Sequence, residues 1–155
     1  EFLRELRKLI GVRDFSGFIR LWNRTLQPNR LVWQAVNLLR MNSFLQGVIS
    51  NINETQAEYI EKVLACGRII EFRPRIYSYR ERVLKPDPLI YRLALHRANE
   101  EYRLSEEILP EECVFVDDRI ENVEAARGCG WHAIHHNPVF VTGTLYRLAE
   151  LGVKI

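Results

Sequence analysis

Side chains that can bind a phosphoryl group or a metal ion follow three segments that are expected to be strands. Ser50 and Asn51 follow the first segment, Lys85 follows the second, and the adjacent Asp117 and Asp118 follow the third. Together they supply a hydroxyl group, an ammonium group and a pair of carboxylates. In an open parallel sheet, ligands bind beyond the carboxyl ends of the strands, which share one edge. The order of these residues therefore predicts one polar site at that edge.

This combination of groups suits phosphoryl transfer with magnesium. Two adjacent carboxylates after an apolar strand are costly to place without a cation. Mg²⁺ prefers oxygen ligands and often shares its site with a substrate phosphate. A lysine can neutralise both the carboxylates and a phosphoryl group, and a serine hydroxyl can donate to a phosphoryl oxygen. Since phosphoryl transfer depends mainly on positioning and charge stabilisation, these residues supply its parts.

Each pattern also has a structural interpretation. Ser50 and Asn51 are typical of a helix N-cap and turn, and Lys85 is typical of a solvated loop. Asp117 and Asp118 would favour the positive end of the helix that follows them. Taken singly, the patterns favour these structural roles. Their joint occurrence, in order and each after an expected strand, favours the functional one.

The elements that must position these residues alternate along the chain. Apolar runs predict strands at residues 45–50, 75–79, 113–116 and 132–135, and helical periodicity predicts helices at 54–65, 86–99, 120–127 and 142–151. Residues 1–25 predict two short helices separated by Gly11, and residues 30–42 predict a third. Strands that alternate with helices are typical of an α/β fold, in which helices cover both faces of a parallel sheet.

Composition excludes little beyond this. The chain has 155 residues, enough for one domain with a small appendage, and a net charge of +2 that does not indicate nucleic acid or a membrane surface. Its apolar runs are too short to cross a bilayer. Cys66, Cys113 and Cys129 are odd in number and lack C-x-x-C spacing. We expect reduced thiols in a cytoplasmic protein.

Three segments resemble motifs of a known superfamily. Residues 47–51, 77–91 and 114–127 look like motifs II, III and IV of haloacid dehalogenase-like (HAD) hydrolases, in the subfamily with a helical cap. They are similar to sugar-phosphate phosphatases and to the phosphatase domains fused to some epoxide hydrolases. The resemblance covers residues 30–155. It implies a Rossmann-like three-layer core at residues 26–155 and the C-terminal part of a helical cap at residues 1–25.

The resemblance also implies an activity, which is Mg²⁺-dependent hydrolysis of a small phosphorylated metabolite through a phosphoaspartate. Ser50 and Asn51 would hold the phosphoryl group, and Lys85 would neutralise it together with the nucleophilic carboxylate. Asp118 matches the acid that ligates magnesium. Asp117 would orient Lys85 or a metal-bound water.

Some positions depart from the family pattern. Asn122 stands where many relatives have a second acid, so it would contact the water shell of the metal or cap its helix. Ile52 replaces a frequent threonine, and Arg82 replaces a frequent glycine, which leaves the shape of that loop open because glycine alone readily takes a positive φ.

The largest departure concerns motif I, an Asp-x-Asp in which the first aspartate is the nucleophile. No Asp-x-Asp follows an apolar strand in these residues, and the chain begins at Glu1 inside a helical pattern. In the family, the strand before motif I is central in the sheet. We therefore expect an inactive fragment that lacks its first central strand, and predict neither its substrate nor its oligomeric state.

Four other interpretations stay open. One is a regulatory or binding domain that has lost motif I. A haloacid dehalogenase is disfavoured by the acid pair at Asp117, and a receiver-type signalling domain is disfavoured because its acids come first in the chain. The basic, aromatic stretch at residues 68–85 would suit a nucleic-acid groove, but we expect a strand and loop with a solvated face. In that stretch, Arg80 or Arg82 would attract an anionic substrate. We interpret His135 and His136 as rim residues.

Overall fold

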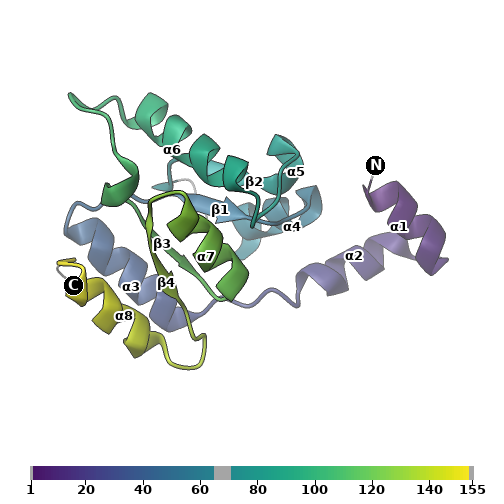
Figure 1. The fold of residues 1–155 in the computed structure, drawn as a ribbon. Helices are drawn as coiled ribbons and strands as arrows, with labels where there is room; N and C mark the ends of the chain where they lie inside the picture. Colours follow the sequence, from purple (N-terminus) through teal and green to yellow (C-terminus); the bar gives the residue numbers. More distant parts are fainter. Residues whose placement is uncertain (1, 65–70, 154–155) are drawn as a thin grey trace.

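The computed structural model describes residues 2–64 and 71–153 and contains two pairs of parallel strands (Figure 1). Strand β1 (Val48–Ser50) pairs with β2 (Arg75–Tyr77), and β3 (Val114–Asp117) pairs with β4 (His132–His135). The parallel direction predicted from the alternation is confirmed. Within the described residues, however, the strands form two separate two-stranded sheets instead of one continuous sheet.

The helices lie close to their predicted positions. They are α1 (Phe2–Ile10), α2 (Phe15–Asn23), α3 (Arg30–Met41), α4 (Glu54–Tyr59) with a π-helical turn at Ile60–Leu64, α5 (Ser78–Glu81), α6 (Pro88–Tyr102), a 3₁₀ turn at Pro110–Glu112, α7 (Ile120–Gly128) and α8 (Val141–Glu150). Ala65, Cys66 and Arg68, which the predictions included, lie outside the described residues.

The strand predicted at residues 75–79 is shorter than expected. It ends at Tyr77, and Ser78 and Tyr79 belong to α5. The Ser78 hydroxyl accepts from the Ile52 N–H at 2.9 Å and donates to the Ile52 carbonyl at 3.2 Å. Because this side chain satisfies main-chain groups that a longer β2 would have bonded, the strand ends here and the chain turns into a helix.

Helix α6 is capped at its N-terminus and packs into the main core of the protein. Asp87 caps its N-terminus by accepting from the Leu89 N–H at 2.9 Å, and Pro88 occupies the first turn, where no N–H is needed. Its buried face packs against β3 and α7 in one core, in which the Tyr91 ring meets the Phe115 ring edge to face at 5.3 Å. The core members are Ile76, Val83, Ile90, Tyr91, Ala94, Phe115, Val123, Ala126 and Ala133.

Helices α1 and α2 extend to one side of this core (Figure 1). The end of α2 contacts the rest of the protein, where the buried Asn23 donates to the Thr55 carbonyl of α4 at 3.1 Å. The division into a cap at residues 1–25 and a core at residues 26–155 stays a prediction. No helix in the described ranges has the length and apolar character needed to cross a membrane.

Candidate active site at the carboxyl ends of β1 and β3

Lys85 joins the ends of the two sheets. Its Nζ donates to Asp117 Oδ2 at 2.6 Å and to the Ile49 carbonyl oxygen at 2.9 Å. The side chains of Lys85 and Asp117 are only 10% and 7% exposed. The ammonium group also lies 5.4 Å from the centre of the Phe115 ring, a favourable distance for a cation. One largely buried positive charge thus lies where β1 and β3 end.

Asn51 fixes the main chain of Lys85. Its side-chain Nδ2 donates to the Lys85 carbonyl at 2.8 Å, and its Oδ1 accepts from the Lys85 N–H at 2.8 Å. The loop after β1 and the loop after α5 are therefore joined by two hydrogen bonds from one amide. The sequence predicted that the Asn51 backbone or side chain would help to hold the phosphoryl group. In the structure the side chain holds Lys85, and the role at the phosphoryl group stays a prediction.

Asp117 is held on its other side as well. Its Oδ1 accepts from Asn122 Nδ2 at 2.8 Å and from the Arg119 N–H at 2.9 Å. Burial opposes the ionisation of this carboxyl group, but the hydrogen bonds from Lys85, Asn122 and Arg119 outweigh it and hold the pKa of Asp117 below its ordinary value. Both carboxylate oxygens are therefore engaged, and Asp117 acts as an ionised partner for Lys85.

Asn122 is set by a further contact. It is 3% exposed, and its carbonyl accepts from the Tyr91 hydroxyl at 2.9 Å. Its side chain donates to Asp117, so it can orient that carboxylate, and its contact with the water shell of a metal stays a prediction. Sequence reasoning did not identify Tyr91 as part of this network, because a tyrosine on a helix face is a common core residue and carries no signal of its own.

Asp118 and Ser50 have free polar groups. Asp118 is exposed, and within the described ranges its carboxylate has no hydrogen bond or ion pair, while its carbonyl lies 3.0 Å from His135 Nε2. The half-buried Ser50 likewise has no recorded partner for its hydroxyl in those ranges. Among the described residues, no three or more His, Cys, Asp or Glu side chains are grouped so that they could hold a metal ion by themselves. Asp118 is thus the one acid of the pair whose side chain is open to a new ligand.

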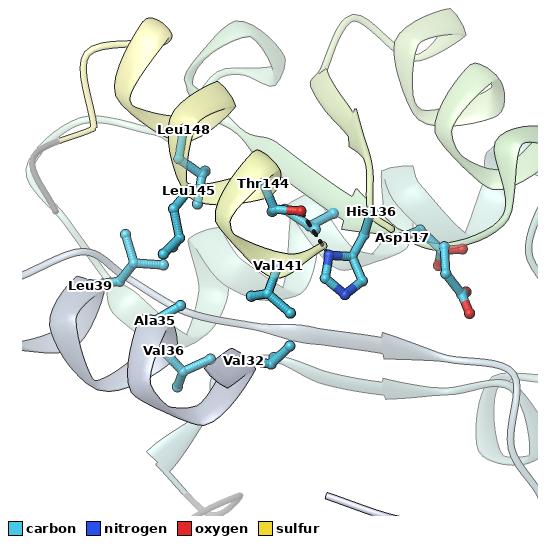
Figure 2. Close-up of a pocket in the computed structure, with 12 residues that line it drawn as sticks. Val32, Ala35, Val36, Leu39, Asp117, His136, Val141, Thr144, Leu145 and Leu148 are labelled. Carbon is cyan, nitrogen blue, oxygen red and sulfur yellow. Dashed lines mark hydrogen bonds between the residues drawn. The ribbon is translucent and has the colours of Figure 1, made fainter. Parts of the chain in front are cut away.

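A cavity of about 330 Å³ opens beside the acid pair (Figure 2). Its walls are mostly apolar side chains from α3 and α8, namely Val32, Ala35, Val36, Leu39, Val141, Leu145 and Leu148. At the end near Asp117, His136 Nδ1 lies 2.7 Å from the Thr144 hydroxyl (Figure 2). The main-chain N–H of His136 donates to the main-chain carbonyl of Asp117 at 2.8 Å. His136 therefore lies at the rim, next to the predicted metal-binding acids.

Comparison with known proteins gives a family and a fold. The sequence profile of haloacid dehalogenase-like hydrolases matches residues 2–130. A search of curated proteins found no match.

Solved structures resemble the chain at low identity. A HAD family enzyme from Bacteroides thetaiotaomicron, solved as a magnesium complex, has 21% identity and a TM-score of 0.70, over 94% of this chain and 72% of that one. A variant of that enzyme, in complex with magnesium and inorganic phosphate, has a TM-score of 0.68 over 88% and 69% of the two chains. An uncharacterized protein from Corynebacterium glutamicum has 21% identity and a TM-score of 0.57, over 77% and 81%. These similarities show that the two pairs of parallel strands and their helices have the same fold as these solved structures.

Proposed function

The chain belongs to the haloacid dehalogenase-like hydrolases, and we propose on this premise that its site serves a magnesium-dependent phosphomonoester hydrolase. The observation that carries the proposal is the position of the Lys85 ammonium group, 2.6 Å from Asp117 and 2.9 Å from the Ile49 carbonyl. The Lys85 ammonium group has three N–H donors, of which Asp117 and Ile49 take two, and the third can bind a phosphoryl oxygen in a site where water screens charge poorly. The Bacteroides enzyme with bound magnesium and inorganic phosphate supports the same chemistry.

In this proposal each residue has one task. Lys85 neutralises charge on the phosphoryl oxygens, and the Ser50 hydroxyl donates to one of them. Asn51 fixes the Lys85 main chain through its two 2.8 Å hydrogen bonds, so the ammonium group does not have to be positioned when substrate arrives. Asp117 keeps Lys85 in place and is itself held by Asn122.

The acid pair fits a magnesium ion that shares its site with substrate. Asp118 offers an exposed carboxylate without a side-chain partner, whereas both oxygens of Asp117 are engaged. Mg²⁺ commonly takes one or two carboxylates and completes its shell with water and phosphate oxygens, so one free acid is enough for such a site. Asp118 would hold the ion, and Asn122 would act through Asp117. When bound, magnesium would supply positive charge to the phosphoryl oxygens.

The nucleophile of the proposed reaction is an aspartate that these residues do not contain. We place it at the end of a fifth strand between β1 and β3. Three observations support this placement. The two sheets are not joined by a ladder in the described residues, Val116 of β3 is 40% exposed, and the apolar cavity lies beneath β3 between α3 and α8. A parallel strand there would cover Val116, fill the cavity with its side chains and end beside Lys85.

The test is hydrolysis of p-nitrophenyl phosphate, with and without magnesium, by two proteins. One is the 155-residue chain, and the other carries an added N-terminal strand ending in Asp-x-Asp. We expect activity only in the second protein, and loss of that activity with EDTA. Activity in neither protein, with both folded, would instead indicate a binding or regulatory role. Activity in the 155-residue chain alone would mean that the nucleophile lies within it.

A further inference from the structure

A second cavity, of about 460 Å³ and widely open to solvent, borders the proposed phosphoryl site. The residues that line it include Asn51, which directly follows Ser50 in the sequence, and Leu84, which directly precedes Lys85. Between them it includes Tyr79 and Arg82 of the α5 segment. Asn51 lines this cavity and also makes the two hydrogen bonds to the Lys85 main chain. A group that enters the cavity therefore lies next to a phosphoryl group held by Ser50 and Lys85.

Arg82 adopts an unusual backbone conformation in this wall. Its φ of 57° and ψ of 27° place it in the left-handed region at the C-cap of α5, where its N–H donates to the Ser78 carbonyl at 2.8 Å. Side chains disfavour this region, and glycine takes it without strain. The backbone of this turn therefore does not require a side chain at position 82. Any role of the arginine lies in what its guanidinium group can bind.

The guanidinium group of Arg82 has no recorded partner in the described ranges, and the residue is exposed. Its neighbour Arg80 is different, since its guanidinium carbon lies 5.2 Å from the Tyr77 ring and 5.3 Å from the Tyr79 ring, and its Nε donates to the Tyr79 hydroxyl at 2.8 Å. Sequence reasoning left open which of the two arginines would attract an anion. Arg80 is occupied, whereas among the described residues that line this cavity Arg82 is the cation whose side chain has no partner.

We infer that Arg82 determines specificity by binding a second anionic group, a carboxylate or a second phosphate, on the alcohol part of the phosphomonoester. This inference rests on the proposed function, because the phosphoryl end of the ligand is assigned to Ser50 and Lys85. A guanidinium fork pairs well with a carboxylate or phosphate through two hydrogen bonds. The site would therefore prefer a doubly anionic ester to one whose alcohol part carries only hydroxyl groups.

The experiment compares two esters that share one carbon skeleton. Binding of glycerol 3-phosphate, 3-phosphoglycerate and inorganic phosphate to the 155-residue chain is measured by titration calorimetry with magnesium present. We expect 3-phosphoglycerate to bind about tenfold more tightly than glycerol 3-phosphate, a typical effect of a hydrogen-bonded charge pair. Arg82→Gly should abolish this preference and leave phosphate binding and thermal stability intact. Arg82→Lys should keep part of it, and the control Arg80→Gln should keep all of it.

The outcomes separate this inference from the proposed function. Phosphate binding without a preference between the esters, or with a preference that survives Arg82→Gly, would overturn the role of Arg82 and leave the phosphoryl site in place. Binding of 3-phosphoglycerate that depends on Arg82, without binding of inorganic phosphate, would retain Arg82 as an anion site and overturn the phosphoryl site. Binding of none of the three ligands would overturn both.

Discussion

The Nζ of Lys85 lies 2.6 Å from Oδ2 of Asp117, and this pair connects the loop after α5 to the end of β3. The two side chains are 10% and 7% exposed, so both charges are largely shielded from water and lie in direct contact with each other. Removing one member of a buried pair leaves an uncompensated charge, which commonly costs about 3 to 5 kcal/mol. Removing both charges together costs much less.

The first prediction uses this difference. Lys85→Met should lower the free energy of unfolding by about 3 kcal/mol, because Asp117 is left ionised and buried. The double variant Lys85→Met, Asp117→Asn should recover most of that loss, since neither charge remains. Both proteins should fail to bind inorganic phosphate. Urea unfolding and calorimetry measure the two effects, and a Lys85→Met protein of normal stability would contradict the buried pair.

The second prediction concerns the two hydrogen bonds between the Asn51 side chain and the Lys85 main chain. Asn51→Ala removes two hydrogen bonds of 2.8 Å that fix the Lys85 main chain. Because Asn51 is exposed, we expect the free energy of unfolding to fall by only about 1 kcal/mol. Phosphate affinity should fall about tenfold, because the ammonium group is no longer preset.

Asn42→Ala is the matched control for this variant. Asn42 is also exposed, and its Nδ2 donates to the Leu38 carbonyl at 3.0 Å, at the end of α3 that precedes β1. Its loss should lower stability by a similar amount and leave phosphate affinity unchanged. An equal loss of affinity in both variants would show that Asn51 acts through general stability.

Much of the fold could be predicted from the sequence, because the signals are local. The strand at His132–His135 and the α7 helix from Ile120 follow from hydrophobic periodicity and from Gly128. The early end of β2 at Tyr77 could not be predicted, because it depends on Ser78 reaching Ile52 across 26 positions of sequence. The loop at Arg82 keeps a left-handed conformation although glycine is absent, which the sequence left undecided.

The site shows the same division. The residue types that follow the expected strands were enough to predict that Lys85 and Asp117 lie close together, because parallel strands place their carboxyl ends on the same side. An orienting contact between Asp117 and Lys85 was expected, but the contacts of Asn51 and Asn122 were not predictable, because they depend on side-chain orientation. Asn51 turns toward the Lys85 main chain, and Asn122 turns toward Asp117. The assignment of Asp118 to magnesium stays a prediction.

The third prediction tests that assignment. Asp118→Asn should leave the free energy of unfolding within about 0.5 kcal/mol of the original, because the side chain is exposed and has no recorded partner in the described residues. In contrast, the gain in phosphate affinity on adding magnesium should be lost. Calorimetry at two magnesium concentrations measures this gain. Its survival in Asp118→Asn would remove Asp118 from the metal site, and Glu124→Gln, at an exposed acid on the helix that follows, serves as the control.

The fourth prediction concerns the buried Tyr77. It is 1% exposed, and its hydroxyl makes no hydrogen bond within 3.5 Å to any other residue that the structure describes. Burial, with the nearby charge of Glu61, raises the pKa of Tyr77 from 10.0 to about 12. Because the folded state holds this proton more tightly than the unfolded state, its contribution to stability is complete below pH 10 and declines as the pH rises toward about 12.

Tyr77→Phe should therefore lessen the fall in stability between pH 10 and about 12. At neutral pH this variant should be as stable as the original or more stable by up to about 1 kcal/mol, because an unpartnered buried hydroxyl is removed. Urea unfolding across this pH range is the measurement. Tyr146→Phe, at a residue that is 66% exposed, should leave the slope unchanged. An unaltered slope in Tyr77→Phe would show that its hydroxyl titrates alike in both states.

The fifth prediction tests the strand proposed between β1 and β3. Val116 is 40% exposed in the 155-residue chain, so Val116→Ala there should change the free energy of unfolding by no more than about 0.5 kcal/mol. In the protein that carries the added strand, Val116 would be covered, and the same substitution should cost about 1.5 kcal/mol, as expected for two methylene groups. Phe115→Leu is the control, because Phe115 is 7% exposed and should cost a similar amount in both proteins. If Val116→Ala costs the same small amount in both, no strand covers β3, and the nucleophile must reach Lys85 from another direction.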